Sequence, residues 1–344
     1  MGGNGRVCLC RGYSWNNFCS LSSKIFDKRN YGWSDQRVRF DCVSIGAWAA
    51  FDKIWSLDSD FVDGGTAQVL HSEYINRLFF GDCSFNVAVG AKNLGLHVGV
   101  VSVVGQDFED LKYAKFLQDR DIDISGVTVL PTRLSGYNIN ITTSAGTTFC
   151  ITQADASLEQ DKVTSYGEAI ENASWVVVSE KFSEYTLQAV RIAKNHGSKV
   201  LINGSIGNGS FISREILSMA DVLVTNKSEF DALRSFGMED LTPPVVVITF
   251  GSKGAEIHTG EGIISIPPVS SSGIIDTTGA GDSLVAGLVA GLVKGFSLED
   301  SVRIGACAAS LVITEVGCQS RQYDWHEVLE IFEAIKSQEN AHGE

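Results

Sequence analysis

DTTGAGDSLVAGLVAGLV, residues 276–293, joins a glycine-rich loop with two carboxylates to a continuous apolar run. The apolar part, residues 284–293, is too short to cross a bilayer, which needs roughly 20 residues, so it predicts a helix buried in a protein core. The glycines then lie where that helix begins, and its first backbone N–H groups lack intrahelical partners and attract anions. Asp282 is suited to take a proton from a hydroxyl while these amides stabilise the charge that develops.

The composition of the chain is that of a globular protein. Its 344 residues are 44% hydrophobic and 20% charged, a size that suits one large α/β domain with an insertion, or two domains. The formal net charge of −14 argues against general binding to nucleic acids or membrane surfaces, because both attract basic patches. The eight cysteines show no C-x-x-C spacing, so we expect reduced, mostly buried thiols. We therefore expect a cytoplasmic protein that acts on small molecules.

Residues 1–40 differ in composition from the rest of the chain. Seven Lys and Arg residues stand against two Asp and no Glu, a net charge of +5. This composition is typical of an organellar targeting segment. A disordered extension, or a start codon assigned too early, explains it as well.

Short apolar runs alternate with segments of helical length. Strands are expected at 42–47, 98–105, 173–180, 199–205, 221–226 and 245–251. Helical segments such as FNVAVGAKNLG (85–95) and KSEFDALRSFG (227–237) stand among them. This alternation predicts an α/β fold, a mostly parallel sheet flanked by helices on both faces, with ligands bound beyond the carboxyl ends of the strands.

One segment breaks the alternation. SGYNINITTSAGTTFCIT (135–152) has two stretches of alternating polarity around a Ser-Ala-Gly turn, which predicts an antiparallel hairpin. We find no fixed-period repeat and no low-complexity linker. The sequence therefore predicts a single compound domain in which a small antiparallel β-sheet is inserted.

The motifs at the strand ends resemble those of a known family. The Walker pattern and a strand-following G-x-G-x-x-G are both absent, which argues against P-loop NTPases and dinucleotide dehydrogenases. Residues 276–282 match every fixed position of D-T-x-G-A-G-D, a signature of the ribokinase-like (pfkB) carbohydrate and nucleoside kinases. The family's N-x-x-E, T-x-G-x-x-G and N-terminal signatures resemble Asn226 with Glu229, Thr249 with Gly251 and Gly254, and GDCSFN at 81–86. The likeness extends from about residue 42 to 335, in family order.

The resemblance implies roles on the phosphoryl side of a site. Asp282 would be the general base, and the amides of Gly279, Ala280 and Gly281 would hold the transferred phosphoryl group. Asn226 and Glu229 would organise Mg²⁺ and phosphate, with Glu229 acting through water. ATP would contact Asn226, Thr249, Gly251, Ser252, Lys253, Gly254 and Gly281.

Plainer readings of the same residues stay open. Asn226 and Glu229 also suit a helix N-cap with an acidic first turn, and Asp282 suits a capping carboxylate. Asp276 and Thr278 match part of a monovalent-cation site, for K⁺, that many relatives carry near the anion site. A turn-forming aspartate is the alternative for Asp276.

The acceptor side is also implied by the resemblance. Asp52 matches an aspartate that binds sugar hydroxyls, and Gly81 and Asn86 match the substrate loop. Asp82 stands where the family normally has a second glycine, which would narrow or alter the floor of the pocket. Glu180 falls where ribokinases place a sugar-contacting glutamate, although a surface carboxylate explains it as well.

The segments at about 53–82 and 133–155 would form a β lid over the acceptor in this family. A lid excludes water and so prevents futile hydrolysis of ATP. We expect a kinase domain at 41–335, an extension at 1–40 and a tail at 336–344. An edge of the lid could pair between two subunits to form a homodimer.

These observations together predict an ATP- and Mg²⁺-dependent kinase. The acceptor would be a primary hydroxyl of a sugar or nucleoside, with a ribose-containing compound favoured. A fructokinase-type sugar kinase is one alternative. A non-catalytic member that keeps the fold for partner binding is the other.

Overall fold

The computed structural model describes residues 40–342, apart from residues 61–65, 67, 71–75, 145–147, 167, 205–209, 242 and 272. The expectations for the N-terminal extension, including targeting, concern residues that lie almost wholly outside this range. Most of the predicted Ser-Ala-Gly turn also lies outside it. In the part of the chain described, no helix combines the length and apolar character needed to cross a membrane.

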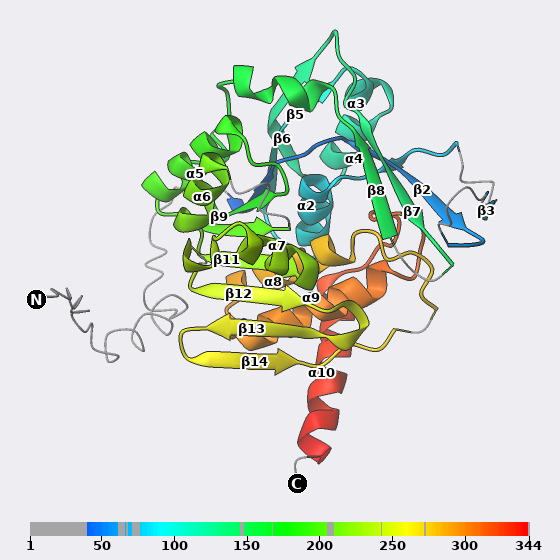
Figure 1. Cartoon of the computed structure of the whole chain (residues 1–344), viewed down its shortest axis with the longest axis vertical. Coiled ribbons are helices and arrows are strands. Elements are labelled where there is room, and N and C mark those ends of the chain that lie inside the picture. The colour runs from blue at the N-terminus through cyan, green and yellow to red at the C-terminus, as the bar shows by residue number, and fades with distance from the viewer. Residues whose placement is uncertain are drawn as a thin grey trace, which may run out of the picture.

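A nine-stranded sheet forms the centre of the molecule (Figure 1). Its strand order is β14-β13-β12-β11-β10-β9-β1-β5-β6. The seven strands from β12 to β6 in this order run parallel, and β13 and β14 add an antiparallel edge. The strands are β1 (Phe40–Ile45), β5 (Val98–Gly105), β6 (Asp123–Leu130), β9 (Ala173–Ser179), β10 (Lys199–Asn203), β11 (Val222–Asn226), β12 (Val245–Thr249), β13 (Ala255–Thr259) and β14 (Gly262–Ile266). The predicted mostly parallel sheet is confirmed.

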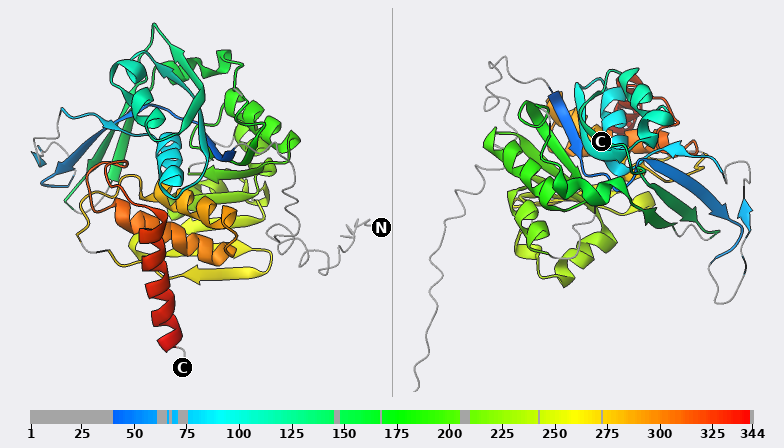
Figure 2. Two further views of the ribbon diagram at one scale, coloured as in Figure 1. Left: turned by 180° about the vertical axis from the view of Figure 1, so that it is seen from behind. Right: turned by 90° about the horizontal axis from the view of Figure 1, so that it is seen from above.

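Helices cover both faces of this sheet, as Figures 1 and 2 show. Side chains alternate along each strand, so that Leu201 of β10 packs into one core while Val200 and Ile202 pack into the other. The first core is closed by α2 (Cys83–Asn93), α4 (Tyr113–Gln118), α8 (Ala280–Val293), α9 (Leu298–Val312) and α10 (Trp325–His342). The second is closed by α5 (Glu184–Asn195), α6 (Phe211–Met219) and α7 (Lys227–Ser235). Short helical turns stand at α3 (Asp107–Asp110), η4 (Ala156–Lys162), η5 (Glu239–Leu241) and η6 (Gly251–Lys253).

The predicted buried helix is α8, and its glycines let α9 come very close. A Cβ at Gly287 would lie 2.6 Å from the Cα of Gly305, and one at Gly291 would lie 2.7 Å from the Oγ of Ser301. Leu288 and Val289, which lie between these two glycines in the helix, have no exposed surface. The apolar run therefore packs on several sides, and this packing holds the start of α8 in place.

A second, smaller sheet is formed from two separate parts of the chain. It consists of β2 (Phe51–Leu57), β3 (Val69–Leu70), β4 (Phe79–Phe80), β7 (Tyr137–Thr142) and β8 (Thr148–Gln153), which we call the lid sheet. The hairpin β7–β8 is antiparallel, as predicted, whereas β2 and β7 run parallel. The lid sheet projects to one side of the larger sheet in Figures 1 and 2. It begins at Phe51, so Asp52 belongs to its first strand.

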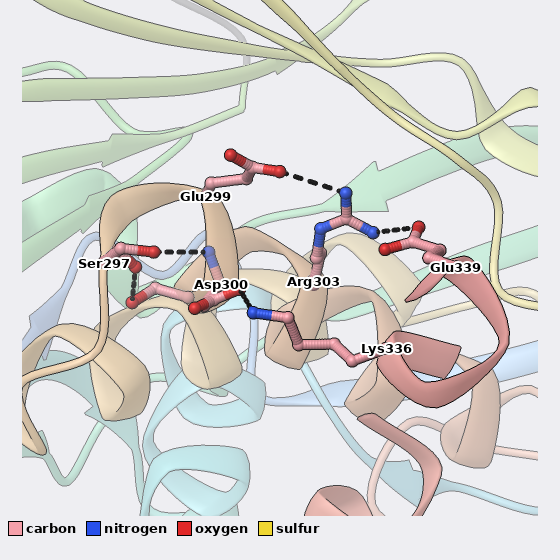
Figure 3. Close-up of polar contacts among 7 residues, drawn as sticks. Ser297, Glu299, Asp300, Arg303, Lys336 and Glu339 are labelled. Carbon is pink, nitrogen blue, oxygen red and sulfur yellow. Dashed lines mark hydrogen bonds and ion pairs between the residues drawn. The ribbon is translucent and has the colours of Figure 1, made fainter. Parts of the chain in front are cut away.

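The last helix continues past the boundary expected at residue 335. Residues 336–342 are part of α10, which is anchored to α9 by ion pairs (Figure 3). Arg303 of α9 contacts Glu299 at 3.0 Å and Glu339 of α10 at 2.5 Å. Lys336 contacts Asp300 at 2.8 Å. Residues 336–342 therefore extend a helix of the domain.

Candidate active site

Three residues predicted for the site, Thr249, Asn226 and Glu180, lie along one edge of the large sheet. Five neighbouring strands end there, and the residues at or just after their ends are, in sheet order, Thr249, Asn226, Asn203, Glu180 and Gly46. Asn226 lies directly opposite Thr249 in the β11–β12 register. Parallel strands bring their carboxyl ends together in this way, which produces the crevice where ligands bind in such sheets.

The start of α8 forms an open, glycine-lined surface. Gly279 is the N-cap with φ 82°, and a Cβ there would lie 2.7 Å from the Cβ of Cys318, so only glycine fits. Gly281 is exposed, and apart from its chain neighbours and the backbone of its own helix, no described atom lies within 4 Å of where its Cβ would be. The amide of Ala280 donates to the carbonyl of Thr277 at 3.3 Å and is partly engaged in a turn. The space beside Gly281 therefore suits an anion held by helix N-terminal amides.

Asp282 lies next to this surface and is held by two side-chain amides. Its Oδ2 accepts a hydrogen bond from Asn86 Nδ2 at 2.8 Å, and its Oδ1 accepts one from Asn203 Nδ2 at 2.9 Å. Burial raises the pKa of Asp282 to about 6, and the hydrogen bonds from both asparagines oppose that rise. The carboxylate is thus ionised at neutral pH and fixed in direction, as a general base requires.

Asn86 is itself held by a buried polar chain. Gln319 donates from Nε2 to Asn86 Oδ1 at 2.9 Å and to Tyr113 Oη at 2.7 Å. The hydroxyl of Tyr113 donates to the carbonyl of Gly81 at 3.2 Å. This chain fixes the orientation of the Asn86 amide, so that its NH₂ group faces Asp282.

Asp52 connects the lid sheet to the site. It is 2% exposed, and its Oδ1 accepts a hydrogen bond from Asn138 Nδ2 of β7 at 3.1 Å. Thr152 of β8 donates to Asn138 Oδ1 at 2.8 Å, which orients that amide. A Cβ on Gly81 would lie 1.7 Å from Asp52 Oδ2, so this glycine leaves the room that the carboxylate occupies. Burial raises the pKa of Asp52 above its usual range, although Asn138 and Cys318 donate hydrogen bonds to it.

Asp82 and Glu180 both have positive φ, at 71° and 50°. Asp82 Oδ2 accepts hydrogen bonds from the backbone N–H groups of Trp48 and Ala49, at 3.1 and 2.8 Å. Glu180 stands at the end of β9, and burial, together with the charge of Asp282, raises its pKa to about 7. The charge of Asp282 acts on both acids, so both lie near it, and the Asp82 carboxylate holds the backbone of Trp48 and Ala49.

Asn226 and Glu229 form a capping box, the structural role that the sequence also allowed for them. Asn226 Oδ1 accepts from the Glu229 N–H, and Glu229 Oε2 accepts from the Asn226 N–H, both at 2.9 Å. Thr225 also donates to Glu229 Oε2, at 3.0 Å. At this edge of the sheet Asn226 is exposed and Glu229 half-buried. The cap sets their direction, and it is compatible with the role in metal and phosphate binding.

The predicted nucleotide loop follows β12. Gly251 and Gly254 have φ of 59° and 92°, and a Cβ at Gly254 would lie 2.1 Å from the carbonyl oxygen of Ile266. Residues 251–253, including Ser252 and Lys253, form an exposed helical turn. The glycines therefore shape a tight, solvent-facing turn next to Asn226.

Asp276 connects the DTTGAGD loop to the loop after α9. Its Oδ1 accepts hydrogen bonds from the N–H and the Oγ1 of Thr278, at 3.0 and 2.7 Å. These bonds form the turn that the sequence suggested as the alternative role of Asp276. Its Oδ2 accepts from the Gly317 N–H at 2.9 Å. No cluster of three or more His, Cys, Asp and Glu side chains suited to a metal ion occurs in the described chain.

Several residues of the site were not singled out from the sequence. They are Asn203, Gln319, Tyr113, Asn138 and Asn140. Asn203 ends a predicted strand, and the asparagines of β7 alternate with apolar residues, so polar residues at strand ends and on the inner face of the lid were available signals. Gln319 and Tyr113 offered none, because only the fold brings them to Asn86.

The fold and the site define a class of protein, and comparison with known proteins identifies it. The model of the pfkB family of carbohydrate kinases matches residues 77–325, more than half of the chain. The chain therefore belongs to the pfkB carbohydrate kinase family, as its motifs predicted. Members are phosphotransferases with an alcohol group as acceptor, and this chain is a small-molecule kinase of that type.

Individual relatives include nucleoside and sugar kinases. The chain is 30% identical to a nucleoside kinase of Methanocaldococcus jannaschii over 271 residues, covering 75% of this chain and 86% of the relative. It is 26% identical to a ribokinase of Haemophilus influenzae, covering 75% and 88%. The crystal structure of the M. jannaschii nucleoside kinase matches with a TM-score of 0.73 at 26% identity, covering 86% and 99%. A Burkholderia thailandensis nucleoside kinase in complex with inosine shares the fold, with a TM-score of 0.76 at 21% identity, covering 85% and 97%.

Proposed function

We propose that this protein transfers the γ-phosphoryl group of ATP to a primary hydroxyl of a ribose-containing acceptor, a nucleoside or ribose itself. The observation that carries the proposal is the position of Asp282. Its carboxylate, directed by Asn86 and Asn203, stands beside the open start of α8. The lid-side Asp52 and the nucleotide loop flank it along the strand ends.

The proposed reaction needs a base and a site for negative charge. Asp282 takes the proton of the acceptor hydroxyl as its oxygen attacks the γ-phosphorus and the bond to the β-phosphate oxygen breaks. With a pKa of about 6, Asp282 is mostly ionised at pH 7, yet basic enough to accept that proton. The amides at Gly279–Gly281 hold the charge on the transferred group, and one such donor contributes about 10²–10³ in rate.

The residues on the β11–β12 side fit ATP and Mg²⁺. Open space beside Gly281 admits phosphate to the backbone. Oε2 of Glu229 is held by its capping box, and among the described residues no hydrogen bond engages Oε1. Bound Mg²⁺ would neutralise phosphate charge there, held by Glu229 through water. We also propose that K⁺ binds near Asp276 and Thr278, whose loop is attached to Gly317.

The acceptor side favours a compound with several hydroxyl groups. Asp52 and the asparagines of β7 present hydrogen-bonding groups from the lid sheet. A site built to bind hydroxyls in this way rejects analogues that lack them. The relatives named nucleoside kinase support a nucleoside, and the ribokinase supports the free sugar.

A panel assay tests this proposal. ADP production is measured with adenosine, pseudouridine, ribose and fructose, and the product is examined for a phosphate on the primary hydroxyl. The Asp282→Asn variant should fold and bind ATP but lose at least about 10² in kcat. Near-normal turnover by this variant would refute the assignment of the base. Turnover of fructose alone would favour the fructokinase alternative, and ATP binding without turnover would favour the non-catalytic one.

We also propose a homodimer formed through the lid sheet. Phe149 and Ile151 of β8 are 53% and 46% exposed, and they are two residues apart, so they share a face. β8 is the last strand in the order of the lid sheet and offers an edge for pairing. Light scattering should give twice the mass of the chain, and Ile151→Lys should shift it to the monomer.

A further inference from the structure

The linker between the two sheets is held from both sides. Residues 46–50 connect β1 of the large sheet to β2 of the lid sheet. Gly46 begins the linker with φ 106°, and a Cβ there would lie 2.4 Å from the carbonyl oxygen of Ser179. The linker leads directly to Asp52, so its conformation determines where that carboxylate lies.

Asp82 holds the linker on one side. Its Oδ2 accepts the N–H groups of both Trp48 and Ala49, and the side chain is 5% exposed. The backbone at Asp82 has φ 71° and ψ 143°, a conformation in which glycine is favoured over every residue that has a Cβ. The aspartate adopts this strained conformation while its carboxylate satisfies a part-buried amide and a buried one.

Ser157 and Lys181 hold the linker on the other side. Ser157 donates from Oγ to the carbonyl of Trp48 at 2.7 Å. Lys181 donates to the carbonyl of Ser157, and its ammonium lies 4.3 Å from the centre of the Trp48 ring. Lys181 is 4% exposed, and no ion pair of this lysine with an acid occurs among the described residues. Its ammonium contacts Ser157 and the Trp48 ring, and the charges of Asp161 and Asp82 also act on it.

Gly81 connects Ala50, at the end of the linker, to the carboxylate of Asp52. The N–H of Gly81 donates to the carbonyl of Ala50 at 3.2 Å, and Gly81 also packs on the Asp52 carboxylate. Asp82 follows Gly81 directly. A displacement of residues 48–50 would therefore displace the acceptor-binding carboxylate.

We propose that Asp82 is a positioning residue that, together with Ser157 and Lys181, holds the linker so that Asp52 is directed into the acceptor site. The inference rests on the proposed kinase function for its kinetic consequence only. It differs from the pocket-floor role expected from the sequence, because Asp82 acts through Trp48 and Ala49.

The test compares Asp82→Gly with Asp82→Asn. The glycine relieves the backbone strain but removes the carboxylate, whereas the asparagine keeps one oxygen able to accept both N–H groups. We expect Asp82→Gly to raise the KM for the acceptor roughly tenfold, the scale of one or two lost hydrogen bonds, with little change in the KM for ATP. Asp82→Asn should keep most of the wild-type affinity for the acceptor. Ser157→Ala should change the acceptor KM in the same direction as Asp82→Gly, by less.

Asp121→Gly is the matched control. Asp121 also has positive φ, at 54°, but it lies at the surface in an ion pair with Lys92. This variant likewise replaces an aspartate of positive φ with glycine, at a position outside the linker, and should leave both KM values unchanged. Hydrogen exchange at the Trp48 and Ala49 amides gives a second readout that needs no activity, and it should be at least about tenfold faster in Asp82→Gly.

Unchanged exchange at these amides in Asp82→Gly would overturn the inference. Faster exchange with an unchanged acceptor KM would overturn it too, because Asp82 would then be only structural. Absence of turnover by the wild type would refute the proposed function instead, and the exchange rates would still decide whether Asp82 holds the linker.

Discussion

Asn203 donates a hydrogen bond to Asp282 across 79 residues of sequence, with 2.9 Å between Asn203 Nδ2 and Asp282 Oδ1. Asn203 ends β10 and Asp282 lies in the first turn of α8, so the bond connects the sheet to the helix. With Asn86 on the other oxygen, it fixes the plane of the carboxylate. Both bonds also stabilise the ionised form, which limits the rise of its pKa caused by burial.

The first prediction concerns pH. Burial raises the pKa of Asp282 to about 6, and only the ionised carboxylate can accept a proton. We therefore expect kcat to be constant well above pH 6 and to fall tenfold per pH unit well below it. Initial rates at saturating substrates from pH 4.5 to 8.5 measure this. Burial raises the pKa of Glu180 to about 7, so this group could also cause a pH dependence. The Glu180→Gln variant is the control, and its kcat should still begin to fall near pH 6. A rate that stays constant from pH 7 to 5 would contradict the assignment.

The second prediction concerns Asn203. Asn203→Ala removes one donor from the buried carboxylate, so the pKa of Asp282 should rise and the acid limb of the rate profile should move to higher pH. The loss in kcat should be larger at pH 6 than at pH 8, and this difference is the measurement. Ser179→Ala is the matched control, because Ser179 Oγ lies 3.4 Å from Asn203 Nδ2 but does not contact Asp282 in the described structure. A uniform loss at all pH values would mean that Asn203 does not tune the base.

The third prediction separates two glycines of α8. Gly281→Ala meets no neighbouring atom and improves helix propensity, by at most about 1 kcal/mol, so the fold should keep its stability. The added methyl group occupies the anion site, and kcat should fall by about 10² or more, as when an oxyanion donor is lost. Gly287→Ala should instead lower the stability of the fold and leave kcat nearly unchanged. Its Cβ would lie 2.6 Å from the Cα of Gly305, and such overpacking costs about 1–3 kcal/mol. Urea unfolding measures the stability of each variant, and initial rates give its kcat. Equal losses of stability in the two variants would refute the prediction.

The fourth prediction concerns the lid. Asn138→Ala removes the donor that orients Asp52 and should raise the acceptor KM roughly tenfold, with the KM for ATP unchanged. Ser56→Ala is its control, since Ser56 lies opposite Thr142, farther along the same β2–β7 pair. Equal effects of the two variants on the acceptor KM would show that Asn138 merely supports the lid sheet.

Much of the large sheet could be predicted from the sequence because its strands are continuous apolar runs. The segments at 98–105 and 221–226 correspond closely to β5 (Val98–Gly105) and β11 (Val222–Asn226). The antiparallel edge was not predicted. Its strand β14 (Gly262–Ile266) is mostly exposed and follows β13 by a tight turn, so neither burial nor length distinguishes it.

The sequence by itself determined which chemistry was available at the start of α8. Glycines, a carboxylate and an apolar run are adjacent in the chain, so their arrangement follows from local helix geometry. Only the tertiary structure decided what surrounds that carboxylate. Asn86, Asn203 and Gln319 come from three distant segments, and parallel strand ends and packed helices bring them together. The physical reason is that a hydrogen bond depends on distance and direction in space, which separation along the chain does not encode.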